Sequence, residues 1–103
     1  MLHVHGNTIA KLANSITDTP VLVGARSHLK DSKALVLGLC CKDGLSLNAE
    51  NIGKLLNRKD LFFVPFRQDN PITKPYSICF DYKYIIKTLE NALDREQIQP
   101  LLN

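Results

Sequence analysis

The chain has 103 residues, of which 45% are hydrophobic and 22% are charged. This length and composition predict one compact domain over residues 1–103, and they exclude two independent domains or a disordered chain. The net charge of +3 comes from scattered Lys and Arg residues, so no nucleic-acid partner is predicted. No apolar run reaches the roughly 20 residues of a membrane helix, and the first residues lack a secretory signal. We therefore predict a cytoplasmic protein without a membrane partner.

Two amphipathic helices are predicted before residue 34. In the first, over residues 7–16, Asn7 and Thr8 are candidate caps. In the second, Thr19 is the candidate cap and Pro20 suits the first helical position. The expected inward stripes consist of Ile9, Leu12, Ala13 and Ile16 in the first helix, and of Val21, Leu22, Ala25, His28 and Leu29 in the second.

A strand, a helix and a second strand are predicted next. Residues 34–41 form a continuous apolar run, which is typical of a strand buried on both faces. After a turn at residues 42–44, apolar residues at helical spacing predict a helix that ends near Asn57, and residues 61–66 form the second apolar strand. This order is a βαβ unit, in which the two strands are parallel. Residues 2–4 are a candidate third strand.

The remainder of the chain is predicted to be a loop followed by a helix. Residues 67–77 contain Pro71 and Pro75, so we expect a loop at the carboxyl end of the second strand, where open α/β sheets build binding sites. Asp81 is the expected cap of a last helix. The inward residues of this helix are predicted to be Tyr82, Ile85, Ile86, Leu89 and Leu93.

Two or three strands are few for the apolar faces of four helices. We therefore expect an uncovered sheet that exposes four apolar side chains, and an open sheet edge that invites pairing with another chain. A chain of this kind would be marginally stable or oligomeric. The four side chains are Leu35, Leu37, Phe62 and Val64.

The cysteines and histidines predict neither a disulfide nor a metal site. Cys40, Cys41 and Cys79 are an odd number without C-x-x-C spacing, so buried free thiols are expected. His3 and His5 would project from one face of a strand, as two metal ligands do, but no third ligand has a suitable spacing.

Several stretches resemble a family of flavoproteins. Residues 6–18 (GNTIAKLANSITD) are similar to a segment of the phosphopantothenoylcysteine decarboxylases and related FMN enzymes. Four further stretches, in order, resemble the B subunits of the dipicolinate synthases and narrow the resemblance to that family. They are residues 51–57 (NIGKLLN), 63–71 (FVPFRQDNP), 74–77 (KPYS) and 97–100 (QIQP).

The resemblance covers only the carboxy-terminal half of the family's sequence. It implies the carboxy-terminal part of a flavodoxin-like or Rossmann-like three-layer parallel sheet, truncated before the first strand and its phosphate-cradling loop. The implied cofactor is FMN, although the missing loop speaks against binding by this chain alone. The implied activity is oxidation of a dihydrodipicolinate precursor to dipicolinate during sporulation, together with the dehydrogenase-like A subunit of dipicolinate synthase.

Two alternatives to this activity stay open. The first is a non-catalytic remnant or interaction subunit without flavin, which the missing loop favours. The second is a decarboxylase acting on a cysteine-containing substrate. This second alternative is disfavoured because Cys41-Lys42-Asp43 replaces the Asn signature of those relatives.

The resemblance also implies site residues, and each has a simpler structural explanation. His5, Gly6, Asn7, Thr8 and Cys40 correspond to positions near the flavin, but Asn and Thr are also common helix caps and Cys40 could be a small buried residue. No catalytic residue is identified.

Two cations are candidate substrate ligands. Lys42 follows the first strand of the βαβ unit, where it could hold a carboxylate of the substrate or be an ordinary solvated turn residue. Arg67 follows the second strand, and its guanidinium suits a dicarboxylate or an inter-subunit contact equally well.

Overall fold

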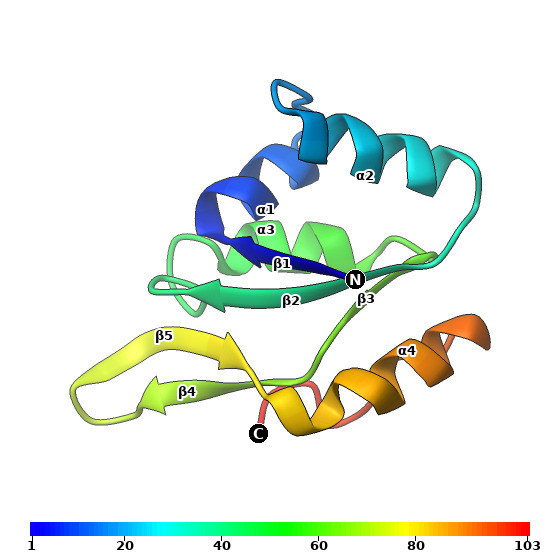
Figure 1. The fold of residues 1–103 in the computed structure, drawn as a ribbon. Helices are drawn as coiled ribbons and strands as arrows, with labels where there is room; N and C mark the ends of the chain where they lie inside the picture. The colour runs from blue at the N-terminus through cyan, green and yellow to red at the C-terminus, as the bar shows by residue number, and fades with distance from the viewer.

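The structure, a computed structural model, describes all residues 1–103 and has one five-stranded sheet with helices on both sides (Figure 1). The α/β class predicted from the sequence is confirmed. No helix is long and apolar enough to cross a membrane. In chain order, the elements are β1 (Leu2–His5), α1 (Gly6–Ala13), α2 (Pro20–Lys30), β2 (Leu35–Cys41), α3 (Ala49–Leu56), β3 (Leu61–Phe63), β4 (Phe66–Asn70), β5 (Lys74–Phe80), a 3-10 turn (Tyr82–Tyr84) and α4 (Ile85–Leu93).

Strand β2 is the centre of the sheet. Strand β1 pairs with it in parallel along one edge, which confirms the candidate strand at the start of the chain. The other edge of β2 is shared, because β3 pairs in parallel with its first half and β5 pairs antiparallel with its end. The predicted parallel βαβ unit is therefore present, but the sheet as a whole is mixed.

The loop predicted over residues 67–77 is wrong, because β4 and β5 form an antiparallel hairpin there. Pro71 and Pro75 were expected to prevent strands, but Pro71 lies in the turn between the two strands and Pro75 is the second residue of β5, near the start of that strand. The side chain of Asn70 organises this turn by accepting hydrogen bonds from the backbone N–H groups of Ile72 and Thr73 at 3.0 and 3.1 Å. The hairpin brings residues 67–69 and 74–79 beside the end of β2.

Helices α1, α2 and α3 lie on one side of the sheet and α4 lies on the other (Figure 1). The predicted cap of α2 is confirmed, since the Thr19 hydroxyl accepts a hydrogen bond from the Leu22 N–H at 3.2 Å. The prediction that β2 is buried on both faces also holds, because only Cys40 in this strand is more than slightly exposed. The buried residues of the three helices are Ile9 and Leu12 in α1, Leu22 and Ala25 in α2, and Ile52 and Leu55 in α3.

The sheet is covered where we expected it to be exposed. Leu35, Leu37, Phe62 and Val64 are all buried, so the predicted uncovered patch does not exist at these positions. Helix α4 packs against β2 and β3 and supplies the missing layer. The Val64 N–H donates to the Leu37 carbonyl at 2.9 Å, which extends the β2–β3 pairing past the last residue of β3.

Helix α4 presents the predicted face only in part, because Ile85 and Leu89 pack against the core as expected but three other predicted residues do not. Its buried residues are Thr88 and Ala92, whereas Tyr82, Ile86 and Leu93 are exposed. Asp81 caps the preceding 3-10 turn through the Lys83 N–H, and this tighter turn shifts the helical phase. Thr88 is tolerated in the core because its hydroxyl donates to the Tyr84 carbonyl at 2.6 Å.

Candidate functional site

The candidate site lies at the edge where β1 and β2 end. His5 is the last residue of β1 and pairs with Cys40, the next-to-last residue of β2. Helix α1 begins directly after β1, while a turn that contains Lys42 and Asp43 follows β2. The carboxyl edge of parallel strands is where open α/β sheets bind ligands.

The N-terminus of α1 has no side-chain cap. His5 is the residue that precedes the helix, and its side chain makes no capping hydrogen bond. Asn7 and Thr8, expected as candidate caps, instead lie inside the first turn, so the capping prediction is wrong. The first-turn N–H groups, together with the positive end of the helix dipole, could therefore bind an oxygen of a ligand without competition from a capping side chain.

A hydrogen-bonded cluster lies directly beneath this helix start. The carboxylate oxygen Oδ1 of Asp43 accepts from the Cys41 thiol at 2.8 Å and from the Asn48 amide Nδ2 at 2.9 Å. Gly6 of α1 packs against it so closely that a Cβ there would lie 2.8 Å from both Asn48 Nδ2 and Cys41 Sγ. Gly6 therefore allows α1 to sit on the end of β2.

The cluster fixes two protonation states. Burial raises the pKa of Cys41 to about 11, and the neighbouring Asp43 carboxylate contributes to the increase. The hydrogen bond from Cys41, followed by that from Asn48, lowers the pKa of Asp43. At neutral pH the site therefore contains a protonated thiol, which is a poor nucleophile, and an ionised carboxylate.

A row of amides extends the cluster along the contact between α1 and α3. Asn51 Nδ2 donates to Asn48 Oδ1 at 2.8 Å, and Asn14 Nδ2 donates to Asn51 Oδ1 at 3.4 Å. At the far end, Lys54 Nζ donates to Asn14 Oδ1 at 3.1 Å. Sequence reasoning did not single out Asn48 or Asn51, because their partners come from another helix and from the turn after β2.

The prediction of three free thiols is wrong for two of them. Cys40 and Cys79 occupy paired positions on β2 and β5 and form a disulfide, so only Cys41 is free. Cys79 in turn pairs with Arg67 on β4. Because cross-strand partners project from the same face, His5, Cys40, Cys79 and Arg67 form a row across the sheet. This row joins the candidate flavin positions to the candidate substrate positions.

Lys42 lines a cavity between the end of β2 and the hairpin, with a volume of about 490 Å³. Lys42 and Lys74 both line it, and neither has a carboxylate within salt-bridge distance. Arg67 also has no ionic partner, but it does not line this cavity. The full lining consists of Lys42, Asp69, Thr73, Lys74, Pro75, Tyr76 and Ser77.

The floor of this cavity is polar and internally bonded. Ser77 is buried, and its hydroxyl donates to the Asp69 carboxylate at 2.5 Å. With one carboxylate against two lysines, the cavity lining favours an anion. The sequence segment that contains Lys74 and Ser77 was noticed only as part of a family resemblance, since a predicted loop gave no reason to place it beside Lys42.

The two strand histidines lie together without a third candidate ligand. The ring centroids of His3 and His5 are 5.2 Å apart, and those of His3 and Phe80 are 5.1 Å apart with the two rings in a T-shaped arrangement. Nowhere in the chain do three or more His, Cys, Asp or Glu side chains gather closely enough to hold a metal ion.

The structure is therefore that of an α/β protein in which β1, β2 and β3 run parallel. Its candidate site lies at the carboxyl ends of β1 and β2. No family model matches the chain. The chain is 41% identical over 97 residues to the B subunit of dipicolinate synthase from Bacillus subtilis, and this match covers 94% of the chain and 48% of the relative. The crystal structure of the dipicolinate synthase B subunit from Bacillus halodurans superposes with a TM-score of 0.91 at 42% identity, covering 96% of this chain and 51% of that one.

The chain is thus a relative of the dipicolinate synthase B subunits, as its sequence motifs suggested. It spans about half the length of the relatives that it matches. Similarity of this kind does not assign roles to individual residues, so those of His5, Gly6, Asn7, Thr8, Cys40, Lys42 and Arg67 are proposals.

Proposed function

We propose that this chain contributes the substrate side and part of the flavin side of a dipicolinate synthase. The proposed reaction is oxidation of a dihydrodipicolinate precursor to dipicolinate during sporulation. The observation that carries this proposal is the 41% identity to the Bacillus subtilis protein, which extends over 94% of the chain.

The start of α1 suits the ring of FMN better than its phosphate. The uncapped N–H groups after His5 can donate to flavin carbonyl oxygens. Asp43, however, is ionised close to Gly6 and would repel a phosphate dianion at the same place. We therefore assign the ring, and not the phosphate, to His5, Gly6, Asn7, Thr8 and the neighbouring Cys40.

The substrate side is assigned to cations. A dicarboxylate carries two negative charges, and Lys42 and Arg67 are both free of ionic partners at this end of the sheet. The guanidinium of Arg67 can bind one carboxylate through two parallel hydrogen bonds, whereas Lys42 offers a point charge. Their role is to bind and orient the substrate.

The two sides have separate chemical tasks. When bound, the flavin accepts the electrons that the dihydro ring loses on becoming aromatic. Asp43 keeps its negative charge through the hydrogen bonds from Cys41 and Asn48, and it stays at the α1 edge. Cys41 stays protonated, so a covalent role for its thiol is not part of this proposal.

The partner and the cellular location follow from the same proposal. The relatives are B subunits by name, which implies at least one further polypeptide in those enzymes. We assign this further polypeptide to the dehydrogenase class and the assembly to the cytoplasm.

One observation favours the alternative of a flavin-free interaction subunit. The candidate site described above contains no Gly-rich phosphate-binding loop, and the ionised Asp43 lies close to Gly6 at the start of α1, where it disfavours an anion. In that case the fold would keep its partner surfaces without performing oxidation.

A chimera tests the proposed function. This chain replaces the matched half of the Bacillus subtilis protein in a strain that lacks its own B subunit, and dipicolinate is measured in the spores. We expect dipicolinate to be restored, to fall when Lys42 is changed to Ala, and to persist with Lys30→Ala, which changes an exposed lysine at the end of α2. A folded chimera that produces no dipicolinate would contradict the proposal and favour the flavin-free alternative.

A further inference from the structure

A turn and a hairpin meet beyond the end of β2 and enclose the cavity that Lys42 lines. Strand β5 pairs with β2 only near its own end, so residues 74–77 continue past the end of β2 (Figure 1). The turn after β2 is fixed against this extension, because the Leu45 N–H donates to the Tyr76 carbonyl at 3.0 Å. Gly44 packs so closely on β5 that a Cβ there would lie 2.5 Å from the Ile78 side chain. The turn and the hairpin are therefore held beside each other.

The hairpin wall of this cavity is fixed by its own side chains. The buried Ser77 donates its hydroxyl hydrogen bond to the Asp69 carboxylate, and Gln68 Nε2 donates to the Pro75 carbonyl at 2.8 Å. Asp69 is the one carboxylate in the lining, and it pairs with a hydroxyl instead of a lysine. The two lysines of the lining therefore keep their charges for a ligand.

These two lysines belong to different segments. Lys42 follows β2 directly, next to the flavin edge, which is the edge where β1 and β2 end. Lys74 begins β5, and Ile78 of that strand pairs with Cys41, so Lys74 lies roughly 13 Å farther along the strand than this pair. A ligand with two separated carboxylates can contact both lysines, whereas a small monocarboxylate can contact one.

We propose that Lys74 is a specificity-determining residue, which holds the second carboxylate of a dicarboxylate ligand while Lys42 holds the first. The identity of this ligand, a pyridine or dihydropyridine dicarboxylate, rests on the proposed function. Arg67 pairs with Cys79 at the flavin edge and does not line the cavity, so it shares the first carboxylate with Lys42. Lys74 is the cation that distinguishes two carboxylates from one.

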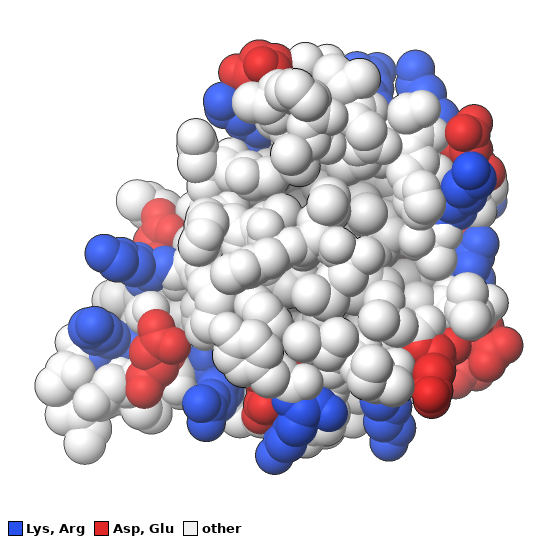
Figure 2. All heavy atoms as spheres, viewed as in Figure 1, with Lys and Arg blue, Asp and Glu red and all other residues white.

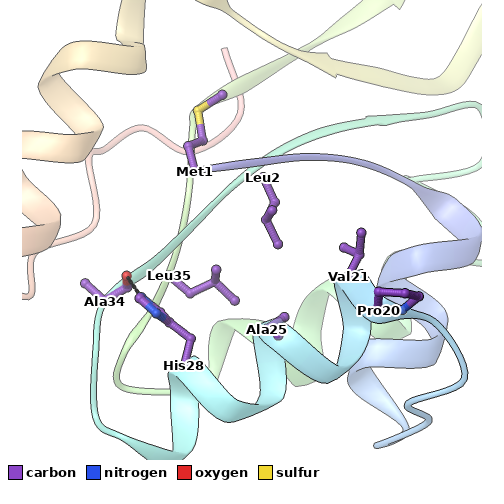
Figure 3. Close-up of a pocket in the computed structure, with 9 residues that line it drawn as sticks. Met1, Leu2, Pro20, Val21, Ala25, His28, Ala34 and Leu35 are labelled. Atoms are coloured by element: carbon purple, nitrogen blue, oxygen red, sulfur yellow. Dashed lines mark hydrogen bonds between the residues drawn. The ribbon is translucent and has the colours of Figure 1, made fainter.

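The distribution of charge over the molecule agrees with this assignment. In the view of Figure 2, charged side chains gather around the hairpin at the lower left and along the rim, whereas the broad area around the N-terminus is free of them. The cavity near the N-terminus, between β1 and α2, has a volume of about 310 Å³ and no Lys or Arg in its lining. Figure 3 shows its apolar side chains, Leu2, Ala25 and Leu35, and the ring of His28, which is bonded to the Ala34 carbonyl at 2.8 Å. This cavity offers a carboxylate no basic side chain.

A third cavity, of about 440 Å³, contains basic side chains but lies at the wrong end of the sheet. It is next to the start of β3, whose first residue pairs with the first residue of β2, far from the flavin edge. Its Arg95 is already bonded to the Asp60 carboxylate and to the Ser32 carbonyl, each at 2.9 Å. Lys59 lines this cavity and is exposed, as Lys74 is, and it therefore provides a matched control.

The experiment titrates the isotope-labelled chain, without flavin, with dipicolinate, picolinate or inorganic phosphate at low salt, and follows the backbone NMR resonances. Dipicolinate has two carboxylates on a pyridine ring and picolinate has one. We expect dipicolinate to shift the resonances of the residues around Lys42 and Lys74, and to bind about fivefold more tightly than picolinate or phosphate.

Two variants assign this preference to one residue. Lys74→Met should weaken dipicolinate binding by about fivefold and change picolinate binding by less than about twofold, because picolinate keeps its contact with Lys42. Lys59→Met should leave the binding of both ligands within about twofold of the original. Unchanged resonances outside the cavity confirm that each variant folds.

Three results would overturn the inference. They are unshifted resonances around the cavity in the presence of dipicolinate, equal effects of Lys74→Met on dipicolinate and picolinate or of the two Met variants on dipicolinate, and phosphate binding as tight as that of dipicolinate. The last result would make the cavity a general anion site. A chimera that makes dipicolinate although this chain fails the titration would refute the inference alone, whereas an inactive chimera beside a successful titration would refute only the proposed oxidation.

Discussion

Replacing Gly6 with Ala tests the packing beneath the candidate site. The new methyl group would lie 2.8 Å from Asn48 Nδ2, 2.8 Å from Cys41 Sγ and 3.5 Å from Asp43 Oδ1. The first two distances are too short for van der Waals contact, so Asn48 and Cys41 must move. Both side chains donate to Asp43, and their movement weakens those hydrogen bonds.

The expected loss of stability follows from opposing effects. Overpacking a well-packed site costs about 1–3 kcal/mol, and a weakened hydrogen bond to a charged group adds to that cost. The gain in helix propensity from Gly to Ala offsets up to about 1 kcal/mol. We therefore expect Gly6→Ala to lower the free energy of unfolding by about 1–2 kcal/mol, or the Tm by roughly 4–16 °C for a domain of this size.

Two other glycines serve as matched controls. Gly24 in α2 and Gly53 in α3 have no atom within 4 Å of the position that a Cβ would occupy. Their replacement by Ala should stabilise the chain by up to about 1 kcal/mol through helix propensity alone.

Thermal unfolding followed by circular dichroism compares the three variants with the original chain. In Gly6→Ala, carboxyl NMR should also show the pKa of Asp43 returning toward its ordinary value. A Gly6→Ala variant with an unchanged or higher Tm would refute the packing argument.

Three further predictions concern stability and flavin content. Stability should fall above pH 9, because the pKa of Cys41 is raised from 9.0 to about 11 and the folded chain retains the proton longer than the unfolded chain. Stability should also fall in acid as the pH drops through the lowered pKa of Asp43. Urea titrations over a pH series in reducing buffer test both the alkaline and the acid loss. Cys41→Ser should remove only the alkaline loss. Arg95→Met should lower the free energy of unfolding in urea by about 1–3 kcal/mol, because the partly exposed Arg95 donates a hydrogen bond to the buried Asp60 at 2.9 Å. An unchanged urea midpoint would contradict this prediction. Finally, the chain purified alone should be colourless, whereas flavin absorbance that follows the protein through gel filtration would show that this chain is sufficient for binding.

The local features of the sequence predicted much of the fold. Thr19 and Pro20 identified the start of α2, and the apolar run before Cys41 identified the buried central strand, because capping and burial patterns are encoded within a few neighbouring residues. The hairpin was missed because Pro71 and Pro75 were taken to indicate a loop, whereas Pro71 lies in the turn and Pro75 is tolerated near the start of β5. The inward face of α4 was predicted only in part, with Ile85 and Leu89 correct, because a 3-10 turn precedes the helix.

The candidate site was predictable only in part. The edge that contains His5 and Lys42 followed from the order of strands and helices. The Asp43 cluster did not, because Asn48 reaches Asp43 only after the turn that follows β2 has folded. Cys40 and Cys79 are 39 residues apart, and their pairing depends on the register between β2 and β5. The sequence contains no local signal for that register.

The central claim is that the carboxyl edge of β1 and β2 binds a flavin beside a dicarboxylate. The most direct measurement is a titration of the purified chimera with FMN, and then with dipicolinate, followed by flavin fluorescence and absorbance. We predict that one FMN binds per chimera and that dipicolinate then perturbs the flavin spectrum, an effect that Lys42→Ala and Arg67→Ala weaken. A folded chimera that binds no FMN, or a flavin spectrum that does not respond to dipicolinate, would contradict this account.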